Sequence, residues 1–271
     1  MKRRGAKKND DEILYLSVCS DLRKNIIISL KEGKKSLSEL RSELEISSTT
    51  AIHALRELEK YNLTSQGKDK KYVLTRIGKI IALKLMDFSA AAEVLKKHER
   101  FWLEHDLCGI PEHLLEKIGL LKDSTLMEDM PTDIFKSHAY FLETLKDAKE
   151  IKGLSSIFHP EYPELIKELV NRKVEVELIV TDKVMDKILE VAEENLRKTL
   201  SSKNFALLVL NEEIKIAFTL TDNTLHLGLF ANDGTYDYNR DIISHNEKAL
   251  SWGRLLYEYY RSKSRKVDLN I

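Results

Sequence analysis

The sequence contains little cysteine and glycine, with 2 Cys and 10 Gly among its 271 residues. Cys19 and Cys108 lie far apart and outside any C-x-x-C spacing, so neither a disulfide framework nor a zinc site is indicated. We expect both to be small core residues of a protein in a reducing compartment. The scarcity of glycine leaves few loops in which backbone amides could cradle a phosphate.

Long apolar runs are also missing. No window approaches the roughly 18 apolar residues that a transmembrane helix needs, and the first residues, MKRRGAKKNDDE, lack the apolar segment of a signal peptide. We therefore expect a cytoplasmic protein without a membrane partner. With 42% apolar and 32% charged residues, a chain of this length is typical of a globular protein with two domains.

The common enzyme signatures are absent as well. The sequence holds no G-x-x-x-x-G-K-[ST], G-x-G-x-x-G, H-E-x-x-H or G-x-S-x-G motif. His105 and Asp106 invite a catalytic interpretation, but adjacent residues on a helix point about 100° apart and cannot form the usual hydrogen-bonded dyad. Packing and helix termination account better for this pair. We expect no catalytic residue, no metal and no cofactor.

Charge is distributed unevenly along the chain. The net charge is zero, yet residues 1–85 hold 19 Lys and Arg against 11 Asp and Glu, a net +8, so the remainder carries −8. A basic first third joined to an acidic remainder indicates one module that faces phosphate and one that avoids it.

The first third is predicted to begin with a helix over residues 13–30. Asp10 or Asp11 can cap it, and Gly33, a residue that tolerates left-handed geometry, is expected to end it. Ser36 and Glu39 then form a capping box, which predicts a helix over 37–44.

A turn and a run of hydroxyl residues precede a second helix whose inward stripe is Ala51, Ala54, Leu55 and Leu58. In a helix-turn-helix the N-terminal residues of this second helix lie in the major groove, where hydroxyl, imidazole and guanidinium groups reach bases and phosphates. Helix capping alone is the alternative for any one of the hydroxyls. The residues predicted to contact DNA are Ser48, Thr49, Thr50, His53 and Arg56.

A basic hairpin follows this helix. Asn62 can occupy a left-handed helix end, and residues 63–65 and 72–75 can pair across a turn of glycine and lysines. Because the turn directly follows a recognition-type helix, Lys68, Lys70 and Lys71 are predicted to contact DNA as a wing, although a charged tip is often only solvated surface.

This segment resembles archaeal and bacterial winged-helix transcription regulators. Their usual pattern appears here as Ser36, Glu39 and Leu40, then Leu55 and Leu58, then Tyr72, Leu74, Thr75 and Gly78. Asn62 replaces the usual glycine, a change that leaves the expected fold intact because Asn adopts the same backbone conformation.

Beyond Thr75 the chain is predicted to be helical to about His105. Apolar residues spaced three and four apart form a short seam typical of a coiled coil, which would pair two copies; packing of the seam on the chain's own second domain is the alternative. The seam consists of Ile81, Leu85, Phe88, Ala92, Leu95 and Trp102.

The run that ends this helix resembles a narrower family. The sequence FWLEHDLCGIP at 101–111, with KGLSSIFHP at 152–160 and ALSWG at 249–253, is similar to methanogen winged-helix regulators of the filamentation and methanogenesis type. That resemblance implies archaeal transcription control in response to a cellular signal.

The remaining sequence alternates between β and α patterns. Residues 150–157 and 174–181 are predicted strands flanking a helix at 161–172, a βαβ unit with a parallel pair. A long helix to about residue 200, β-rich runs at 204–210, 214–220 and 224–230, and a helix at 245–262 complete an α/β domain with a mixed sheet.

Ligands of such sheets bind beyond the carboxyl ends of the strands. This predicts an effector site formed by Ser155, Ser156, His159, Thr181 and Asp182, although simple strand and cap roles are the alternative for each residue. The arrangement also resembles phospholipase-D-like sensor domains. Because no His here has Lys two residues later, the H-x-K chemistry of those enzymes is excluded.

The sequence therefore predicts a winged helix-turn-helix at 1–79, connecting and dimerisation helices at 80–125, and an α/β effector-sensing domain at 126–271. The function predicted is a homodimeric regulator that binds a specific double-stranded DNA sequence and senses a small molecule or a protein partner. The alternative is a protein-interaction module that uses the winged helix as a docking surface, and an enzyme is the third reading.

Overall fold

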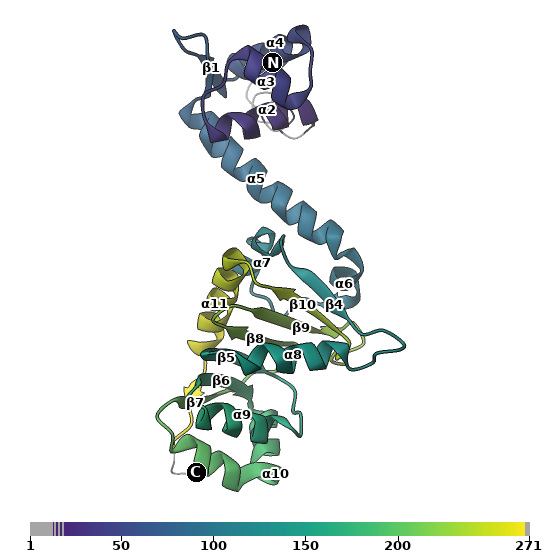
Figure 1. Cartoon of the computed structure of the whole chain (residues 1–271), viewed down its shortest axis with the longest axis vertical. Coiled ribbons are helices and arrows are strands. Elements are labelled where there is room, and N and C mark those ends of the chain that lie inside the picture. Colours follow the sequence, from purple (N-terminus) through teal and green to yellow (C-terminus); the bar gives the residue numbers. More distant parts are fainter. Residues whose placement is uncertain (1–12, 14, 16, 18, 269–271) are drawn as a thin grey trace, which may run out of the picture. The chain divides into compact units, whose positions relative to one another are not determined.

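A computed structural model describes residues 13, 15 and 17 and all residues from 19 to 268. The chain divides into two compact units, the first ending at Ala90 and the second beginning at Ala91. The boundary lies within the long helix α5, Arg76–Lys97, which is visible in Figure 1.

The first unit is a three-helix cluster with a β-hairpin. Its elements are α2 (Asp21–Glu32), α3 (Leu37–Leu44), α4 (Ser48–Lys60), β1 (Thr64–Gln66), β2 (Tyr72–Leu74) and the first turns of α5. The two strands pair antiparallel, with Thr64 opposite Leu74. One apolar core joins the helices and β2, and its fully buried members include Ile26, Leu40, Leu55, Leu58 and Leu63. The predicted order of helix, helix, helix and hairpin is confirmed.

Local signals set most of these boundaries. The Ser36 hydroxyl accepts from the backbone amide of Glu39 at 3.2 Å, and the Glu39 carboxylate accepts from that of Ser36 at 2.6 Å, which completes the capping box. Asn62 adopts a φ of 57°, the left-handed conformation predicted for it. The Thr75 hydroxyl accepts from the backbone amide of Gly78 at 3.0 Å and so caps α5.

Two predictions that bear on this unit were wrong. Helix α2 begins at Asp21 because Ser20 caps it, so no single helix continues from residue 13 to residue 30; the proposed caps Asp10 and Asp11 lie outside the described residues. Gly33 ends the helix as predicted, with a φ of 162°, which is an extended conformation. Both cysteines are exposed, not core residues.

The long connecting helix is interrupted and its apolar seam is divided. α5 ends at Lys97, and α6, Glu99–Glu104, begins after His98, whose φ of −118° and ψ of 35° are not helical. Leu85 packs in the core of the first unit, whereas Trp102 packs in the second. Phe88 and Leu95 stay exposed. The seam predicted from residue 81 to residue 102 is therefore not one continuous face.

A mixed sheet forms the centre of the second unit. Its strands run in the order β11-β7-β6-β5-β8-β9-β10-β4, and β3 pairs with β9 outside this path. β5, β6 and β7 are parallel, while β8, β9, β10 and β4 continue antiparallel. The strands are β3 (His105–Asp106), β4 (Thr125–Glu128), β5 (Glu150–Ser155), β6 (Glu175–Thr181), β7 (Phe205–Leu210), β8 (Ile216–Thr221), β9 (Leu225–Ala231), β10 (Arg240–Ser244) and β11 (Arg265–Lys266).

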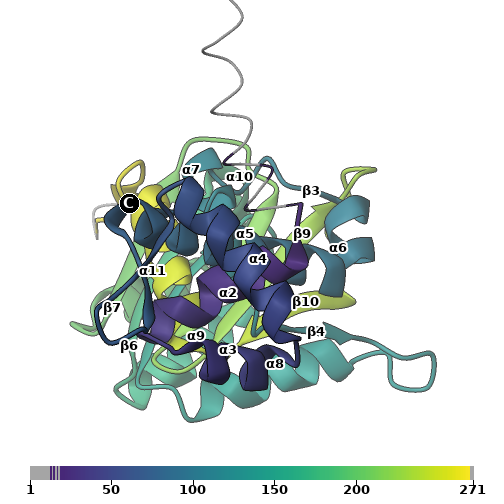
Figure 2. The ribbon, with the colours of Figure 1, turned by 90° about the horizontal axis from the view of Figure 1, so that it is seen from above.

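Helices cover both faces of this sheet. They are α7 (Glu112–Leu115), the 3₁₀ turn η1 (Ile118–Leu121), α8 (Lys136–Lys146), α9 (Tyr162–Asn171), α10 (Asp182–Leu200) and α11 (Glu247–Arg261). The βαβ unit, the three β-rich runs and the last helix lie where they were predicted, but β3, β4, β10, β11 and α8 were not foreseen. Figure 2 shows α8 and α9 together on one side of the strands.

Strand alternation separates two apolar cores. Leu225, Leu227 and Leu229 of β9 face α11, where Trp252 and Tyr257 are fully buried. The opposite face carries Val176 and Val180 of β6, which pack with side chains of α8, α9 and α10. Successive strand residues point to opposite faces, so one strand contributes to both cores.

The junction run at 101–111 belongs to the second unit. Phe101, Trp102 and Ile110 lie in the core beside α11. A Cβ on Gly109 would stand 2.7 Å from the Ile216 side chain, so only glycine allows this close approach. The Trp252 indole donates to the Leu114 carbonyl at 2.9 Å. These contacts place residues predicted to form part of a separate connecting segment, 80–125, inside the sheet domain.

A buried ion cluster fastens β3 to the sheet. His105 has no exposed side-chain surface, and its Nε2 lies 3.0 Å from the Asp237 carboxylate, which also accepts from Arg240 at 2.7 Å. Burial would raise the pKa of Asp237, but hydrogen bonds from His105, the Asn239 amide and Arg240 lower it to about 2. Because His105 is enclosed, this pair is structural.

Asp237→Asn should lower the free energy of unfolding at pH 7 by about 3–5 kcal/mol, since His105 and Arg240 lose a buried carboxylate. The folded pKa lies below the unfolded value of about 3.9, so the carboxylate stabilises the fold above about pH 4 and this stabilisation disappears as pH falls toward 2. Urea unfolding at several pH values measures both effects. Glu194→Gln removes an exposed pair with Lys198 and should change little; equal losses in the two variants would contradict a special role for Asp237.

Candidate functional site

The predicted recognition helix presents its polar residues to solvent. Thr49, Thr50, His53 and Arg56 are exposed and Ser48 is half-buried, while Ala51, Ala54, Leu55 and Leu58 on the other side of α4 are buried. Thr50 also takes part in the helix cap, because its hydroxyl lies 2.7 Å from that of Ser47. The structure therefore assigns Thr50 a capping role and leaves Thr49, His53 and Arg56 as the most available groups.

The hairpin tip presents its lysines unequally. Lys68 and Lys70 are exposed and form no ion pair among the described residues. Lys71 lies 3.7 Å from Glu39, and Asp69 pairs with Lys34 at 2.8 Å. Lys71 is thus partly held against α3, so Lys68 and Lys70 are the wing cations best placed for a phosphate.

A cavity of about 630 Å³ opens on the sheet face that α8, α9 and α10 cover. Small residues on adjacent strands create it: Gly153 of β5 and Ala217 and Gly228 of β8 and β9 line its floor. Ala217 lies directly opposite Gly228. Since these residues add almost no side-chain volume, the helices above the sheet cannot close the space.

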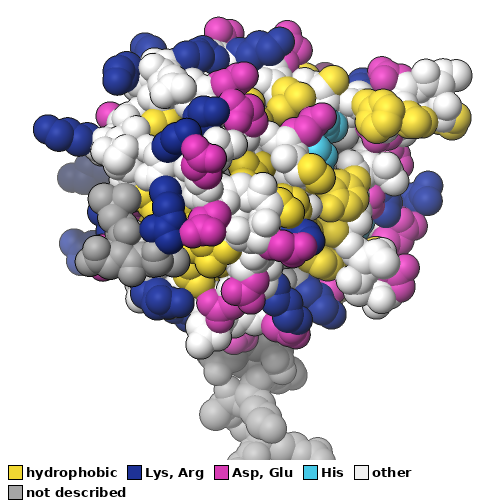
Figure 3. Space-filling view, turned by 90° about the horizontal axis from the view of Figure 1, so that it is seen from below, with side chains coloured by type: hydrophobic (Ala, Val, Ile, Leu, Met, Phe, Trp, Pro, Cys, Tyr) yellow, Lys and Arg dark blue, Asp and Glu magenta, His cyan; other side chains and the backbone are white. Residues whose placement is uncertain are grey.

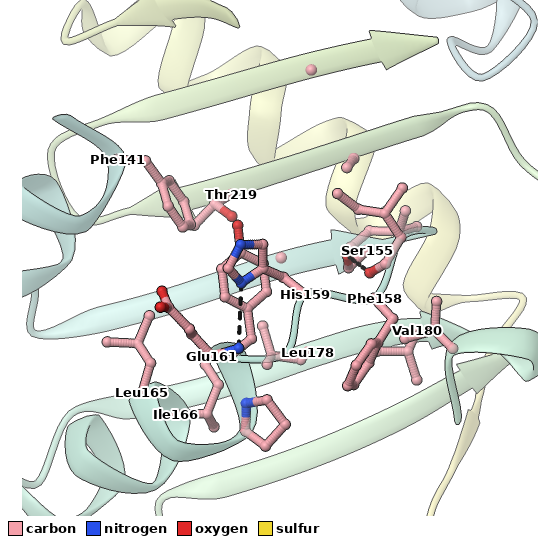
Figure 4. A pocket seen from close by; sticks show the side chains of 18 of the residues that line it. Phe141, Ser155, Phe158, His159, Glu161, Leu165, Ile166, Leu178, Val180 and Thr219 are labelled. Atoms are coloured by element: carbon pink, nitrogen blue, oxygen red, sulfur yellow. Dashed lines mark hydrogen bonds between the residues drawn. The ribbon is translucent and has the colours of Figure 1, made fainter. Parts of the chain in front are cut away.

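The cavity wall is mostly apolar. Figure 4 shows His159 among the lining side chains, with Phe141 from α8, Leu165 and Ile166 from α9, and Leu178 and Val180 from β6. On the surface shown in Figure 3, apolar side chains gather around a histidine, with charged side chains around them.

Two of the five predicted effector residues line this cavity, Ser155 and His159. The Ser155 hydroxyl donates to the Ile157 carbonyl and that of Ser156 to the Ile216 carbonyl, so both support the loop after β5. Thr181 is buried, and Asp182 lines a different hollow beside Arg265 and Lys266. The cavity lies on the face of the sheet and not in the crevice beyond the strand ends, because the small residues occur within the strands.

His226 is a buried polar group of this cavity. Its Nε2 lies 3.0 Å from the Thr144 hydroxyl, while its Nδ1 has no hydrogen-bond partner among the described residues. Burial lowers the pKa of His226 to about 3, and the nearby His245 acts in the same direction. The ring is therefore neutral near pH 7.

Asp241 is the second buried polar group of this cavity. Its carboxylate accepts a hydrogen bond from the Ser137 hydroxyl at 3.3 Å. Burial raises the pKa of Asp241 to about 6, the hydrogen bond opposes this rise, and Asp237 and Asp129 add to it. Among the described residues the wall includes Asp129, Glu161 and Asp241 but no lysine or arginine, so no side-chain cation of the wall neutralises these carboxylates.

Three further groups meet at the cavity. The rings of His138 and His159 stack at 5.0 Å between centroids, and one potential ligand atom from each of them and from Glu161 lie within 4.8 Å of one another. Burial lowers the pKa of His159, His138 reinforces the effect and Glu161 opposes it. The Nδ1 atom of His159 accepts a hydrogen bond from the Glu161 backbone amide at 3.3 Å. These residues could hold a metal if the three donor atoms moved closer together, as a common ion at about 2.0–2.2 Å requires.

Sequence reasoning missed His138, His226 and Asp241. No short motif contains them, because they come from α8, β9 and β10. One signal was present for His226: it alternates with three buried leucines in β9 and so had to face away from the α11 core.

Comparison with known proteins identifies both units. A family model for the N-terminal domain of methanogenesis regulatory protein FilR1 matches residues 13–92, and one for its middle domain matches residues 134–263. The curated FilR1 protein of Methanothrix harundinacea (strain 6Ac) is 30% identical over 253 residues, which are 92% of this chain. The chain spans 56% of that relative's length. The junction run at 101–111 lies between the two matched ranges.

Solved structures are similar only at a low level. TrmBL2, titled an archaeal chromatin protein with a novel mode of DNA binding, aligns over 96% of this chain and 100% of its own, with 17% identity and a TM-score of 0.44. An IclR transcriptional regulator from Alicyclobacillus acidocaldarius covers 89% of this chain and 95% of its own, with 11% identity and a TM-score of 0.26. At these scores neither structure informs the function of this chain. None of the described helices is long and apolar enough to cross a membrane.

Gly228→Ala should destabilise the cavity floor. The added Cβ would lie 2.1 Å from the Tyr236 hydroxyl and 2.8 Å from the Asp241 carboxylate, so we expect a loss of about 1–3 kcal/mol from overpacking. Thermal and urea unfolding of the full chain measure it. Gly33→Ala makes the same change where nothing lies within 4 Å; if it costs as much as Gly228→Ala, crowding at the cavity is not the cause.

Proposed function

We propose that this chain, which belongs to the FilR1 family of methanogenesis regulatory proteins, regulates transcription as a cytoplasmic homodimer that binds a specific duplex DNA sequence and senses a small molecule. The observation that carries the proposal is the first unit: an amphipathic helix α4 with Thr49, His53 and Arg56 exposed, followed by a hairpin with exposed lysines. Helix N-termini of this kind read base edges in the major groove, and basic wings contact phosphate.

The net charge of residues 1–85, +8, supports the DNA assignment. Phosphate contacts supply much of the affinity of DNA-binding proteins, and their number sets the dependence on salt. The remaining residues carry a net charge of −8, which supports a model in which the sheet domain does not contact the DNA.

Homodimerisation is supported by the exposed apolar face of α5. Ile80 is 62% exposed and Phe88 64% exposed, and Ile77 lies on the same side of the helix. A second copy of this helix is the occupant we propose, because paired copies would present two recognition helices to a two-fold DNA site.

The sensing role is supported by the cavity of the second unit, whose volume and apolar wall suit a small molecule. We propose that this domain is not catalytic, and that the earlier likeness to phospholipase-D-like sensor domains extends to ligand sensing only. The buried carboxyl and imidazole groups then serve recognition.

Arg56→Ala should weaken binding to duplexes that the full-length wild type selects from a random pool, by about 1–3 kcal/mol if the guanidinium reaches a base. Lys68→Ala with Lys70→Ala should weaken binding to all duplexes and reduce the slope of log K against log salt by about 2, one unit for each lost phosphate contact. Fluorescence anisotropy at several salt concentrations measures both.

Lys198→Ala, an exposed lysine of α10, is the matched control and should leave affinity and slope unchanged. Unchanged affinity in the Arg56 and lysine variants would contradict the assigned interface. If the wild type selects and binds no duplex at all, the winged helix is a protein-docking surface.

Ile80→Glu combined with Phe88→Glu should convert a dimer into a monomer, since two carboxylates would be desolvated at the paired helices. Light scattering after size-exclusion chromatography gives the mass. Leu255→Glu places the same charge on an exposed apolar position of α11 and should leave the dimer intact. A wild type that is monomeric at tens of micromolar would contradict the proposal.

A further inference from the structure

The cavity is built to accept hydrogen bonds and positive charge. Asp129, Glu161 and Asp241 lie in its wall, and among the described lining residues there is no lysine or arginine. A carboxylate removed from water needs a positive partner or several hydrogen-bond donors. Asp241 has one such donor, the Ser137 hydroxyl at 3.3 Å. An anionic ligand would meet repulsion here, whereas a cationic ligand would supply the missing charge.

The hydrogen-bond pattern of His226 indicates the same preference. The Thr144 hydroxyl donates its only proton to the Phe141 carbonyl at 2.7 Å, so it can only accept from His226 Nε2–H at 3.0 Å. In the neutral ring the proton is then on Nε2, and Nδ1 is a bare acceptor. This residue is 3% exposed, and its Nδ1 is without a partner among the described residues. A buried acceptor without a partner is costly, so a donor that reached this nitrogen would be favoured.

The two acceptors lie on the same face of the sheet. His226 of β9 pairs with Ile243 of β10, and Asp241 stands two residues before Ile243, so both side chains point to the α8 side. A Cβ on Gly228 would lie 2.1 Å from the Tyr236 hydroxyl and 2.8 Å from the Asp241 carboxylate, so glycine makes room at this position for both groups. The two acceptors therefore lie on one face of neighbouring strands, two register positions apart.

We propose that the effector of this cavity is an organic amine, whose protonated nitrogen is held by Asp241 and His226 and whose apolar body lies against Phe141, Phe158 and Leu178. This assignment depends on the sensing role proposed above. The volume of about 630 Å³ is within the range of roughly 300–1,000 Å³ that is usual for small-molecule sites, so the amine has room for one or two rings or a short alkyl chain.

Three indole compounds with the same ring and different head charge test the proposal: tryptamine, tryptophol and indole-3-acetate. Isothermal titration calorimetry on the full chain at pH 7 compares them. Tryptamine should bind about 10-fold or more tightly than tryptophol, because charge-assisted hydrogen bonds are roughly twice as strong as neutral ones, and indole-3-acetate should bind weakest. Equal or tighter binding of tryptophol or indole-3-acetate, or no binding of any of the three, would overturn it.

Variants of the cavity residues test where the three indole compounds bind. Asp241→Asn keeps the shape of the side chain and should abolish the preference for tryptamine, whereas Glu212→Gln, an exposed carboxylate beside Lys263, should retain it. Ala217→Leu fills the cavity floor and should weaken tryptamine and tryptophol alike. Unchanged binding in the Ala217 variant would place the compounds elsewhere and overturn the assignment. If Asp241→Asn does not fold, the ranking of the three compounds on the wild type still decides.

A metal is the competing cation. ZnCl₂ added to the same titration should not displace tryptamine; displacement of tryptamine by Zn²⁺ that His138→Ala abolishes would identify a metal as the occupant and overturn the amine.

Anisotropy with the selected duplex separates this proposal from the proposed function. Tryptamine binding without a change in DNA affinity supports the amine site and contradicts the sensing role. A chain that binds tryptamine through Asp241 and no DNA under any condition likewise supports the amine site, and contradicts the regulator.

Discussion

The second unit depends on one constraint, the two-residue alternation of its central strands. On β9, Leu225, Leu227 and Leu229 are fully buried against α11, while His226 and Gly228 between them face α8 and the cavity. The first set forms a dry core with Trp252 and Tyr257. The second set lines the cavity together with Ala217 of β8, and glycine and alanine fill little volume. One strand thus anchors the domain and opens the cavity, so a substitution at Gly228 affects both the stability of the sheet and the space above it.

Two buried carboxylates of this unit have different partners, and their pKa values differ accordingly. Asp237 and Asp241 are four residues apart, yet the pKa of Asp237 is lowered to about 2 and that of Asp241 is raised to about 6. Asp237 has His105 and Arg240 as partners, and these hydrogen bonds outweigh the cost of burial. Asp241 has one hydroxyl donor and further carboxylates nearby. The first carboxylate therefore stabilises the fold, and the second remains available to a ligand.

Local features of the sequence predicted the first unit well, because caps and turns depend on neighbouring residues. The capping box of Ser36 and Glu39, the left-handed Asn62 and the hairpin were all foreseen, as were the βαβ unit and the last helix. The seam from Ile81 to Trp102 failed as a single face, since its residues pack in two different cores. The prediction that both cysteines are core residues was wrong for a related reason. Composition predicts how often a residue type is buried, and not which side of a particular helix or loop it occupies.

The sequence by itself determined the helix starts, the alternation of the strands, the basic first third and the residues that α4 presents to solvent, because each follows from contacts within a few residues or from counted charge. Only the tertiary structure decided the cavity. It brings together His138 of α8, His159 of the loop after β5, His226 of β9 and Asp241 of β10, which are up to 103 residues apart in the chain. The order of the strands and the helices that cover the sheet bring these four residues together, and no local sequence pattern encodes that arrangement.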